Sequence, residues 1–405
     1  MRCCGALPNV MTEFLSARTP AEIGALAERV AVAESVAFDT EFLWERSYWP
    51  QLCLVQVAID GLEAVADPVD GGDVTSLWEA IASAPLVIVH AGEHDLGIMH
   101  DQIGRLPERI FDTQIAAAFL GWGDSVGHSS LVEALLKRLV KGGEGYTDWA
   151  QRPLSSAQIE YAVEDVRHLH DLWRNLADEL KRRGRTEWVD EEIQQCCAGI
   201  GVLADPREMW RRVKGSNRLN GRALAVLQEI TAWREEEARR RDETRRRLVS
   251  DQVLIEIARR APTDPAQISR MRGLHPGQAR KYAGPLAEVV GDAVRLDERD
   301  WPRRAQRPPY SRDPRIDPVA LVLHGVLRMQ ANALDLGTGL LGTRGDLEEL
   351  VRRYLAAELD GTGPPLPMLE GWRRAAIGND LLRLLEGGAA VRIDFGEPVA
   401  GLTID

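Results

Sequence analysis

Two carboxylates interrupt an apolar stretch near the N-terminus. In SVAFDTEF, residues 35–42, Asp39 and Glu41 stand two positions apart among residues that favour a strand. Side chains at i and i+2 of a strand share one face, and burying two charges there without compensation costs several kcal/mol each. A divalent cation that prefers oxygen ligands, Mg²⁺ or Mn²⁺, would remove that cost. The pair therefore predicts a metal site, although Asp-x-Glu also occurs at 190/192 and 346/348, where a charged helical face explains it.

Two further acids and a tyrosine have spacings that could complete such a site. Asp95 follows the apolar run VIVH at a predicted helix start, where it could equally be a helix cap. Tyr161 and Asp165 are i and i+4, so a helix places them on one face, one turn apart. A tyrosine on an amphipathic helix is more often a core residue than a catalytic one. The candidates are therefore Asp39, Glu41, Asp95, Tyr161 and Asp165.

The first 200 residues alternate strand and helix patterns that would position these side chains. Short apolar runs at SVAF, QLCLVQVAI and EAVAD lie too close together for crossover helices, so they predict an antiparallel meander. VIVH and RIF predict two more strands, Asp112 is expected to cap the helix after RIF, and residues 155–183 form one amphipathic helical pattern. The predicted fold class is α/β, a mixed sheet flanked by helices.

Strand signals nearly vanish after Pro206. Helical patterns broken by Gly, Pro, Asp and Ser fill residues 206–292, and further helices fill 319–390. Residues 293–318, rich in Pro and Arg, are interpreted as a linker. The first domain is expected to span residues 12–200.

The order and spacing of the four acids and the tyrosine resemble the DEDDy 3′-5′ exonucleases. DTEF…YWPQLCLVQ, HAGEHDL, FDTQIAAAFLG and TDWAQRPLSSAQIEYAVEDV resemble ribonuclease D in particular. Residues 206–292 resemble the HRDC domain, and GWRRAAIGNDLLRLLEG resembles the family's second helical domain. The resemblance implies an RNase H-like exonuclease domain followed by two all-helical HRDC-type domains. Position 160 is Glu, so the sister subclass with a His five residues before the last acid does not fit.

The resemblance also implies a mechanism and roles for these residues. Two divalent metal ions, Mg²⁺ or Mn²⁺, would be held by Asp39, Glu41, Asp95 and Asp165, with Asp39 bridging them. Tyr161 would orient the attacking water, and nucleoside 5′-monophosphates would be released. Phe42, by resemblance, would stack near the terminal base, although filling the core explains it equally well.

The charge distribution singles out the middle of the chain. Net charge is −12 overall, yet residues 201–315 hold 26 Lys and Arg against 17 Asp and Glu. In ITAWREEEARRRDETRRR, the pairs 235/239, 236/240 and 237/241 have the i,i+4 spacing of ion pairs. Arg245, Arg246 and Arg247 have no partner at that spacing and are expected to contact phosphates.

Three functions stay open at this point. The first is a 3′-5′ exoribonuclease acting on RNA 3′ ends, in structured RNA such as tRNA precursors; the second is an exonuclease acting mainly on DNA; the third is a non-catalytic RNA-binding protein. The intact set of acids argues against the third. No apolar run reaches the length of a membrane span, and the five cysteines, without C-x-x-C spacing, suit reduced thiols in the cytoplasm rather than zinc.

Overall fold

The computed structural model describes residues 14–140, 147–303, 313–359, 363–394 and 401–404. The chain packs as two units. The first comprises residues 1–41, 53–201 and 307–405, and the second comprises 42–52 and 202–306. Part of the predicted linker, 304–312, lies outside the described residues. Among the described residues, no helix is both long and apolar enough to span a bilayer.

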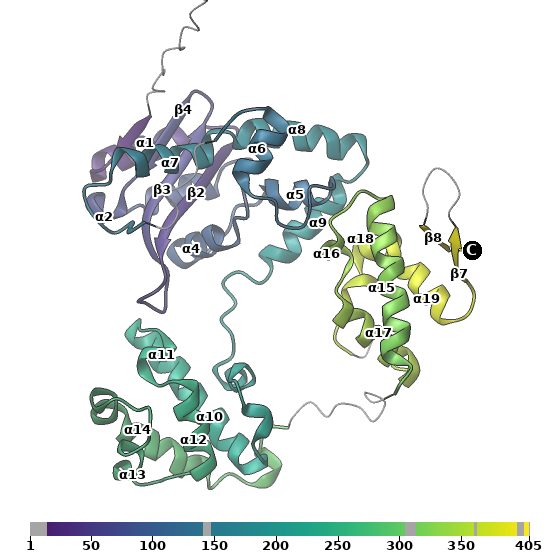
Figure 1. The fold of residues 1–405 in the computed structure, drawn as a ribbon. Coiled ribbons are helices and arrows are strands. Elements are labelled where there is room, and N and C mark those ends of the chain that lie inside the picture. The colour runs from purple at the N-terminus through teal and green to yellow at the C-terminus, as the bar shows by residue number, and fades with distance from the viewer. Residues whose placement is uncertain (1–13, 141–146, 304–312, 360–362, 395–400, 405) are drawn as a thin grey trace, which may run out of the picture. The chain divides into compact units, whose positions relative to one another are not determined.

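A six-stranded mixed sheet of order β1-β4-β3-β2-β5-β6 forms the centre of the first unit (Figure 1). β3 and β4 are antiparallel, whereas β1 with β4, β2 with β5, and β5 with β6 are parallel. The predicted mixed sheet is thus confirmed, with a short additional strand, β1, at one edge. The strands are β1 (Leu15–Ala17), β2 (Val36–Leu43), β3 (Gln51–Ile59), β4 (Leu62–Ala66), β5 (Val87–Val89) and β6 (Ile110–Asp112).

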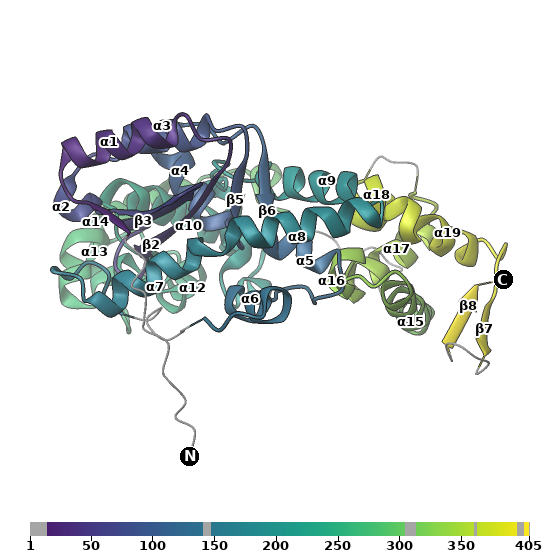
Figure 2. The same ribbon diagram turned by 90° about the horizontal axis from the view of Figure 1, so that it is seen from above.

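Helices cover both faces of this sheet. Figure 2 shows α1, α3 and α4 on one face and α7 and α8 on the other. Phe38 of β2 packs edge-on against Trp78 of α3, with ring centroids 5.7 Å apart, so β2 is held by a buried aromatic contact. The helices are α1 (Pro20–Val30), α2 (Pro68–Gly71), α3 (Thr75–Ala82), α4 (Glu93–Ile103), α5 (Thr113–Ala118), α6 (His128–Leu136), α7 (Ser156–Arg167), α8 (Leu169–Arg182) and α9 (Thr186–Cys197).

The single helix predicted over 155–183 is two helices, α7 and α8. The break falls at His168, whose φ of −100° and ψ of −3° depart from α-helical geometry. Its buried imidazole lies 3.1 Å from a carboxylate oxygen of Glu164 and 3.2 Å from the guanidinium of Arg138. The Arg138 contact comes from outside the helix, so the hydrophobic periodicity of 155–183 carried no sign of it.

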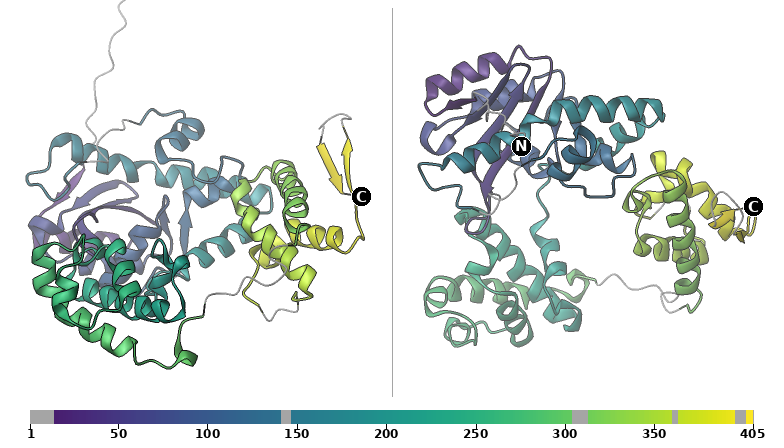
Figure 3. Two further views of the ribbon diagram at one scale, coloured as in Figure 1. Left: turned by 60° about the horizontal axis from the view of Figure 1, so that its bottom comes forward. Right: turned by 45° about the horizontal axis from the view of Figure 1, so that its top comes forward.

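The C-terminal helices pack against α5 and α9 within the first unit. Trp372 stacks on Trp188 of α9 with centroids 5.2 Å apart, and Arg373 makes a 2.7 Å ion pair with Glu192. A two-stranded antiparallel hairpin, β7 and β8, follows these helices (yellow in Figure 3) and was not predicted. The elements are α15 (Ile316–Ala333), α16 (Thr338–Leu341), α17 (Arg344–Ala356), η5 (Pro367–Leu369), α18 (Gly371–Arg373), η6 (Arg374–Gly378), α19 (Asn379–Leu385), β7 (Val391–Asp394) and β8 (Gly401–Ile404).

The second unit is helical around its own buried core. Asn220 and Ser250 cap its two central helices by accepting hydrogen bonds from backbone amides three residues on. Leu227, Ile230 and Leu254 are fully buried between these helices and their neighbours. The elements are η1 (Pro206–Arg212), η2 (Ser216–Arg218), α10 (Gly221–Arg241), α11 (Arg245–Leu248), α12 (Asp251–Arg260), α13 (Pro265–Ser269), α14 (Pro276–Ala293) and η3 (Glu298–Asp300).

Candidate active site

Three carboxylates converge in the first unit. Asp39 and Glu41 project from the same face of β2, and Asp165 comes from α7. One oxygen from each lies within 4.8 Å of the others, and no Lys or Arg is paired with any of the three among the described residues. An all-oxygen donor set of this kind suits Mg²⁺ or Mn²⁺.

Helix α7 holds Asp165 and Tyr161 in place. It begins with a capping box in which Ser155 and Gln158 satisfy each other's backbone amides. The Tyr161 hydroxyl donates a hydrogen bond to Asp165, one turn further on. The Tyr161 ring lies 6.2 Å from that of Trp149, which is 2% exposed, so the tyrosine is fixed at both its ring and its hydroxyl.

Asp95 lies in the first turn of α4 and is buried. It is not the N-cap of that helix, a position that Gly92 occupies. The Thr40 hydroxyl, between the two acids of β2, donates to Asp95 and so links α4 to β2. Asp112 caps α5, as predicted, and also accepts from the amides of Ala91 (3.1 Å) and Gly92 (3.0 Å). These bonds fix the turn from which α4 and Asp95 start.

The electrostatics of the site disfavour ionised carboxylates unless a cation is present. Burial raises the pKa of Glu41 to about 8 and that of Asp165 to about 7. Burial likewise raises the pKa of Asp39 well above its usual range, and the charges of Asp95, Asp165 and Glu41 raise it further. Asp95 lies outside the group of three within 4.8 Å, but its charge contributes to all three shifts. Four mutually repelling acids in one place make a strong attractor for divalent cations.

Burial also raises the pKa of Tyr161 well above its usual value, and the neighbouring carboxylates add to the shift. The hydroxyl therefore stays protonated at neutral pH and is a hydrogen-bond donor rather than a base.

Sequence reasoning missed His128, at the start of α6. Its Nδ1 lies 3.7 Å from Asp165 Oδ1, too far for a hydrogen bond, and neither ring nitrogen has a hydrogen-bond partner in the described part of the chain. Burial lowers the pKa of His128 to about 3, so the imidazole is neutral. Thr40 is the other residue near the carboxylates that was not predicted. Its position between Asp39 and Glu41 could have indicated it from the sequence.

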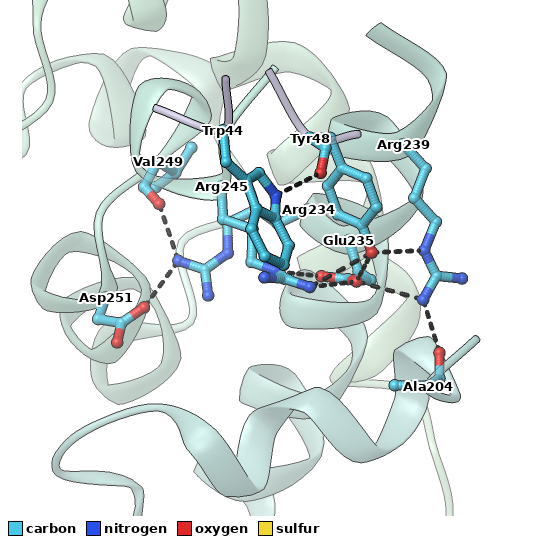
Figure 4. A network of polar contacts seen from close by, with 9 residues as sticks. All are labelled: Trp44, Tyr48, Ala204, Arg234, Glu235, Arg239, Arg245, Val249 and Asp251. Carbon is cyan, nitrogen blue, oxygen red and sulfur yellow. Dashed lines mark hydrogen bonds and ion pairs between the residues drawn. The ribbon is translucent and has the colours of Figure 1, made fainter. Parts of the chain in front are cut away.

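The segment after Glu41 belongs to the second unit, where Tyr48 is its anchor (Figure 4). The Tyr48 hydroxyl donates to Glu235 at 2.5 Å and accepts from Arg239 at 3.0 Å. The backbone amides of Tyr48 and Trp49 both donate to Asp242 at 2.9 Å. The β2–β3 loop is thus bonded to helix α10.

This network corrects the interpretation of Arg245 as unpaired. Arg245 donates to both oxygens of Glu235, at 2.5 and 2.8 Å, and its guanidinium lies 5.0 Å from the centre of the Tyr48 ring. Glu235 also pairs with Arg239, as its spacing predicts, but Arg240 pairs with Glu237 rather than Glu236. Local spacing could not show that Glu235 serves two arginines.

The other predicted substrate contacts differ in their surroundings. Arg246 is exposed, whereas Arg247 donates to the carbonyl of Arg46 at 3.3 Å. Phe42 is half-buried, lies 6.3 Å from the Trp44 ring and is not among the buried core residues, so base stacking stays a prediction for it.

Comparisons with known proteins agree with this architecture. Residues 16–181 match a family model described as 3′-5′ exonuclease, and residues 223–290 match one described as HRDC domain. The chain is 34% identical over 382 residues to ribonuclease D of Zymomonas mobilis, covering 93% of this chain and 95% of the relative. It is 36% identical over 380 residues to ribonuclease D of Gluconacetobacter diazotrophicus, covering 93% and 94%.

A solved structure extends the similarity to the whole fold. Escherichia coli RNase D, described as an exoribonuclease involved in structured RNA processing, superposes with a TM-score of 0.81 at 28% identity, covering 93% of this chain and 99% of that one. The predicted RNase H-like fold and the predicted activity are confirmed. The chain belongs to the ribonuclease D family and is a 3′-5′ exoribonuclease.

Proposed function

We propose that the enzyme shortens structured RNA, such as tRNA precursors, from the 3′ end and that its four carboxylates hold two divalent cations, Mg²⁺ or Mn²⁺. The convergence of Asp39, Glu41 and Asp165 oxygens within 4.8 Å carries the metal proposal. The raised pKa values of these acids support it, because a cation relieves the repulsion that raises them. When bound, the cations supply Lewis acidity that activates a water and stabilises the departing 3′ oxygen.

The protein's own residues have separate roles in this proposal. Asp39 would help to hold the cations, since the charges of all three other acids act on it and raise its pKa. Glu41 and Asp165 would help to hold one ion, and Asp95, which accepts a hydrogen bond from Thr40, would help to hold the other. Tyr161, protonated and bonded to Asp165, positions the attacking water through its hydroxyl oxygen. The released product is a nucleoside 5′-monophosphate.

RNA as the substrate is supported by the family and by what is said of the Escherichia coli relative. Nothing in the four acids and Tyr161 distinguishes a ribose from a deoxyribose, so the DNA alternative is decided by experiment. A cytoplasmic location stays a prediction.

The test is degradation of 3′-labelled RNA, and of DNA with the same sequence, with Mg²⁺, with EDTA and with Asp39→Asn. Asp60→Asn, on the exposed turn after β3, is the matched control for the loss of one carboxylate. We expect RNA degradation only with the cation and only in the wild type and the control. Degradation by Asp39→Asn at the wild-type rate, or in EDTA, contradicts the two-metal proposal, and faster degradation of DNA contradicts the RNA proposal.

A further inference from the structure

The second unit contains a groove of about 1320 Å³ whose lining is strongly basic. Eight of its lining residues are Lys or Arg and two are Asp or Glu. The basic residues come from η1, η2 and the connection between them, from α11 and α12, and from the segment after α13, so the fold gathers them from several places along the chain. Six of the eight matter most here: Arg212, Lys214, Arg218, Arg246, Arg270 and Arg272.

In the part of the chain that the structure describes, no acid is paired with any of these six cations. Within the described ranges, none of their side chains makes an ion pair or a hydrogen bond, although most arginines of α10 pair with glutamates. The two acids of the groove do not compensate them. Asp251 already pairs with Arg234 at 2.8 Å, and Glu256 with Arg260 at 2.5 Å.

An uncompensated cluster of this kind raises the electrostatic potential and attracts an anion with several charges. The groove has no aromatic side chain in its described lining, so it offers no surface for stacking bases. It does offer the hydroxyl of Ser250 and the amides of Gln252 and Gln267, which suit phosphate and ribose oxygens.

We propose that this groove binds the sugar-phosphate backbone of the RNA substrate, without reading its bases. The inference rests on the proposed RNA substrate and assigns its contacts to a surface different from the predicted run Arg245–Arg247. Arg245 forms an ion pair with Glu235, and of the three arginines only Arg246 is among the residues that line the groove. Binding by phosphates alone suits base-paired regions, whose bases are not accessible to stack.

The test compares two charge reversals in the full-length protein. Arg270→Glu with Arg272→Glu changes two exposed residues of the groove. Arg280→Glu with Lys281→Glu makes the same change of charge at exposed positions of α14 outside the groove lining. Binding of a fluorescent RNA hairpin with a 3′ tail is measured by anisotropy in EDTA, so that it does not depend on hydrolysis.

We expect the groove variant to raise the dissociation constant roughly tenfold or more at 0.1 M salt and to reduce the slope of log K against log salt by about 1 to 2. The α14 variant should stay within about twofold of wild type. For each protein, hairpins whose 3′ tails consist of A, U or C should bind with similar dissociation constants. Equal weakening by both variants would indicate net charge rather than a site and would overturn the proposal, as would unchanged binding by the groove variant.

Two further measurements remove the remaining ambiguities. Arg270→Gln with Arg272→Gln, together with thermal unfolding of each variant, separates lost contacts from misfolding and introduced repulsion. Displacement of the hairpin by polyglutamate as readily as by unlabelled RNA would make the groove a site for acidic proteins instead. Hydrolysis of a tetranucleotide by wild type with Mg²⁺ tests the proposed catalytic function separately, so failure of one proposal is distinguishable from failure of the other.

Discussion

Replacing Glu41 with Gln should stabilise the metal-free enzyme while destroying its metal site. The pKa of Glu41 is raised from 4.5 to about 8, so the folded state holds a proton that the unfolded state releases. Below pH 4.5 both states are protonated and the carboxyl costs nothing. As the pH rises from 4.5 to about 8, the unfolded state is increasingly favoured, and the free energy of unfolding falls.

The size of this effect follows from the shift. At pH 8 the raised pKa of Glu41 corresponds to about 4 kcal/mol, because each pH unit between 4.5 and the raised pKa contributes about 1.36 kcal/mol. Water that reaches the carboxyl screens part of this, so we expect about 1 to 2 kcal/mol. Glu41→Gln removes the ionisable group and should be more stable than wild type at pH 8 by that amount, with little difference at pH 4.5.

The assay is urea unfolding in EDTA at pH 4.5 and pH 8, for wild type, Glu41→Gln and the exposed control Glu133→Gln on α6. Saturating Mn²⁺ should reverse the order at pH 8, because only the wild type has the complete ligand set. The reasoning is refuted if wild type and Glu41→Gln lose the same stability between the two pH values, or if Mn²⁺ stabilises both equally.

Three other changes have defined outcomes. Tyr161→Phe keeps the ring beside Trp149 but loses the hydroxyl, so single-turnover rates should fall about 10- to 1000-fold with metal affinity nearly unchanged. An unaltered rate would show that Tyr161 contributes only to packing. Removing the cation with EDTA should abolish activity, and adding Mg²⁺ back at pH 6.5 should release protons, since the pKa of Asp165 is about 7; calorimetry in two buffers detects this. Arg185→Lys cannot reproduce the bonds that Arg185 makes to the carbonyls of Phe119 (2.6 Å) and Asp335 (3.3 Å), so it should lower the unfolding free energy by about 2 kcal/mol in urea titrations, whereas the exposed Arg174→Lys should not.

The sequence predicted those parts of the molecule that depend on short spacings. Asp39 and Glu41 share a face because strands repeat every two residues, and Tyr161 and Asp165 do so because helices repeat every 3.6. Asp95 lies near these residues because β2 and β5 are parallel neighbours in the sheet. The apolar runs predict the strands but not which strands are neighbours. The hydrogen bond from Thr40 to Asp95 could not be predicted from local spacing, since it joins residues 55 apart.

Interactions across long separations explain the errors. Arg245 has no acid at the i,i+4 spacing of a helical ion pair, whereas its partner Glu235 lies 10 residues earlier, on α10. The imidazole of His168, at the helix break, contacts Arg138, 30 residues earlier. Hydrophobic periodicity reports which face of an element is buried and not which polar group meets it there.

The anchoring of Tyr48 has a consequence for how the protein is made. Tyr48 is synthesised 187 residues before Glu235, so at 5 to 20 residues per second its partner appears roughly 10 to 40 s later. Until then the loop that follows Glu41 lacks the bonds that hold Tyr48 and Trp49. A nascent chain that has reached only Gly201 therefore carries all four acids, while the loop after Glu41 still lacks its hydrogen-bond partners on α10.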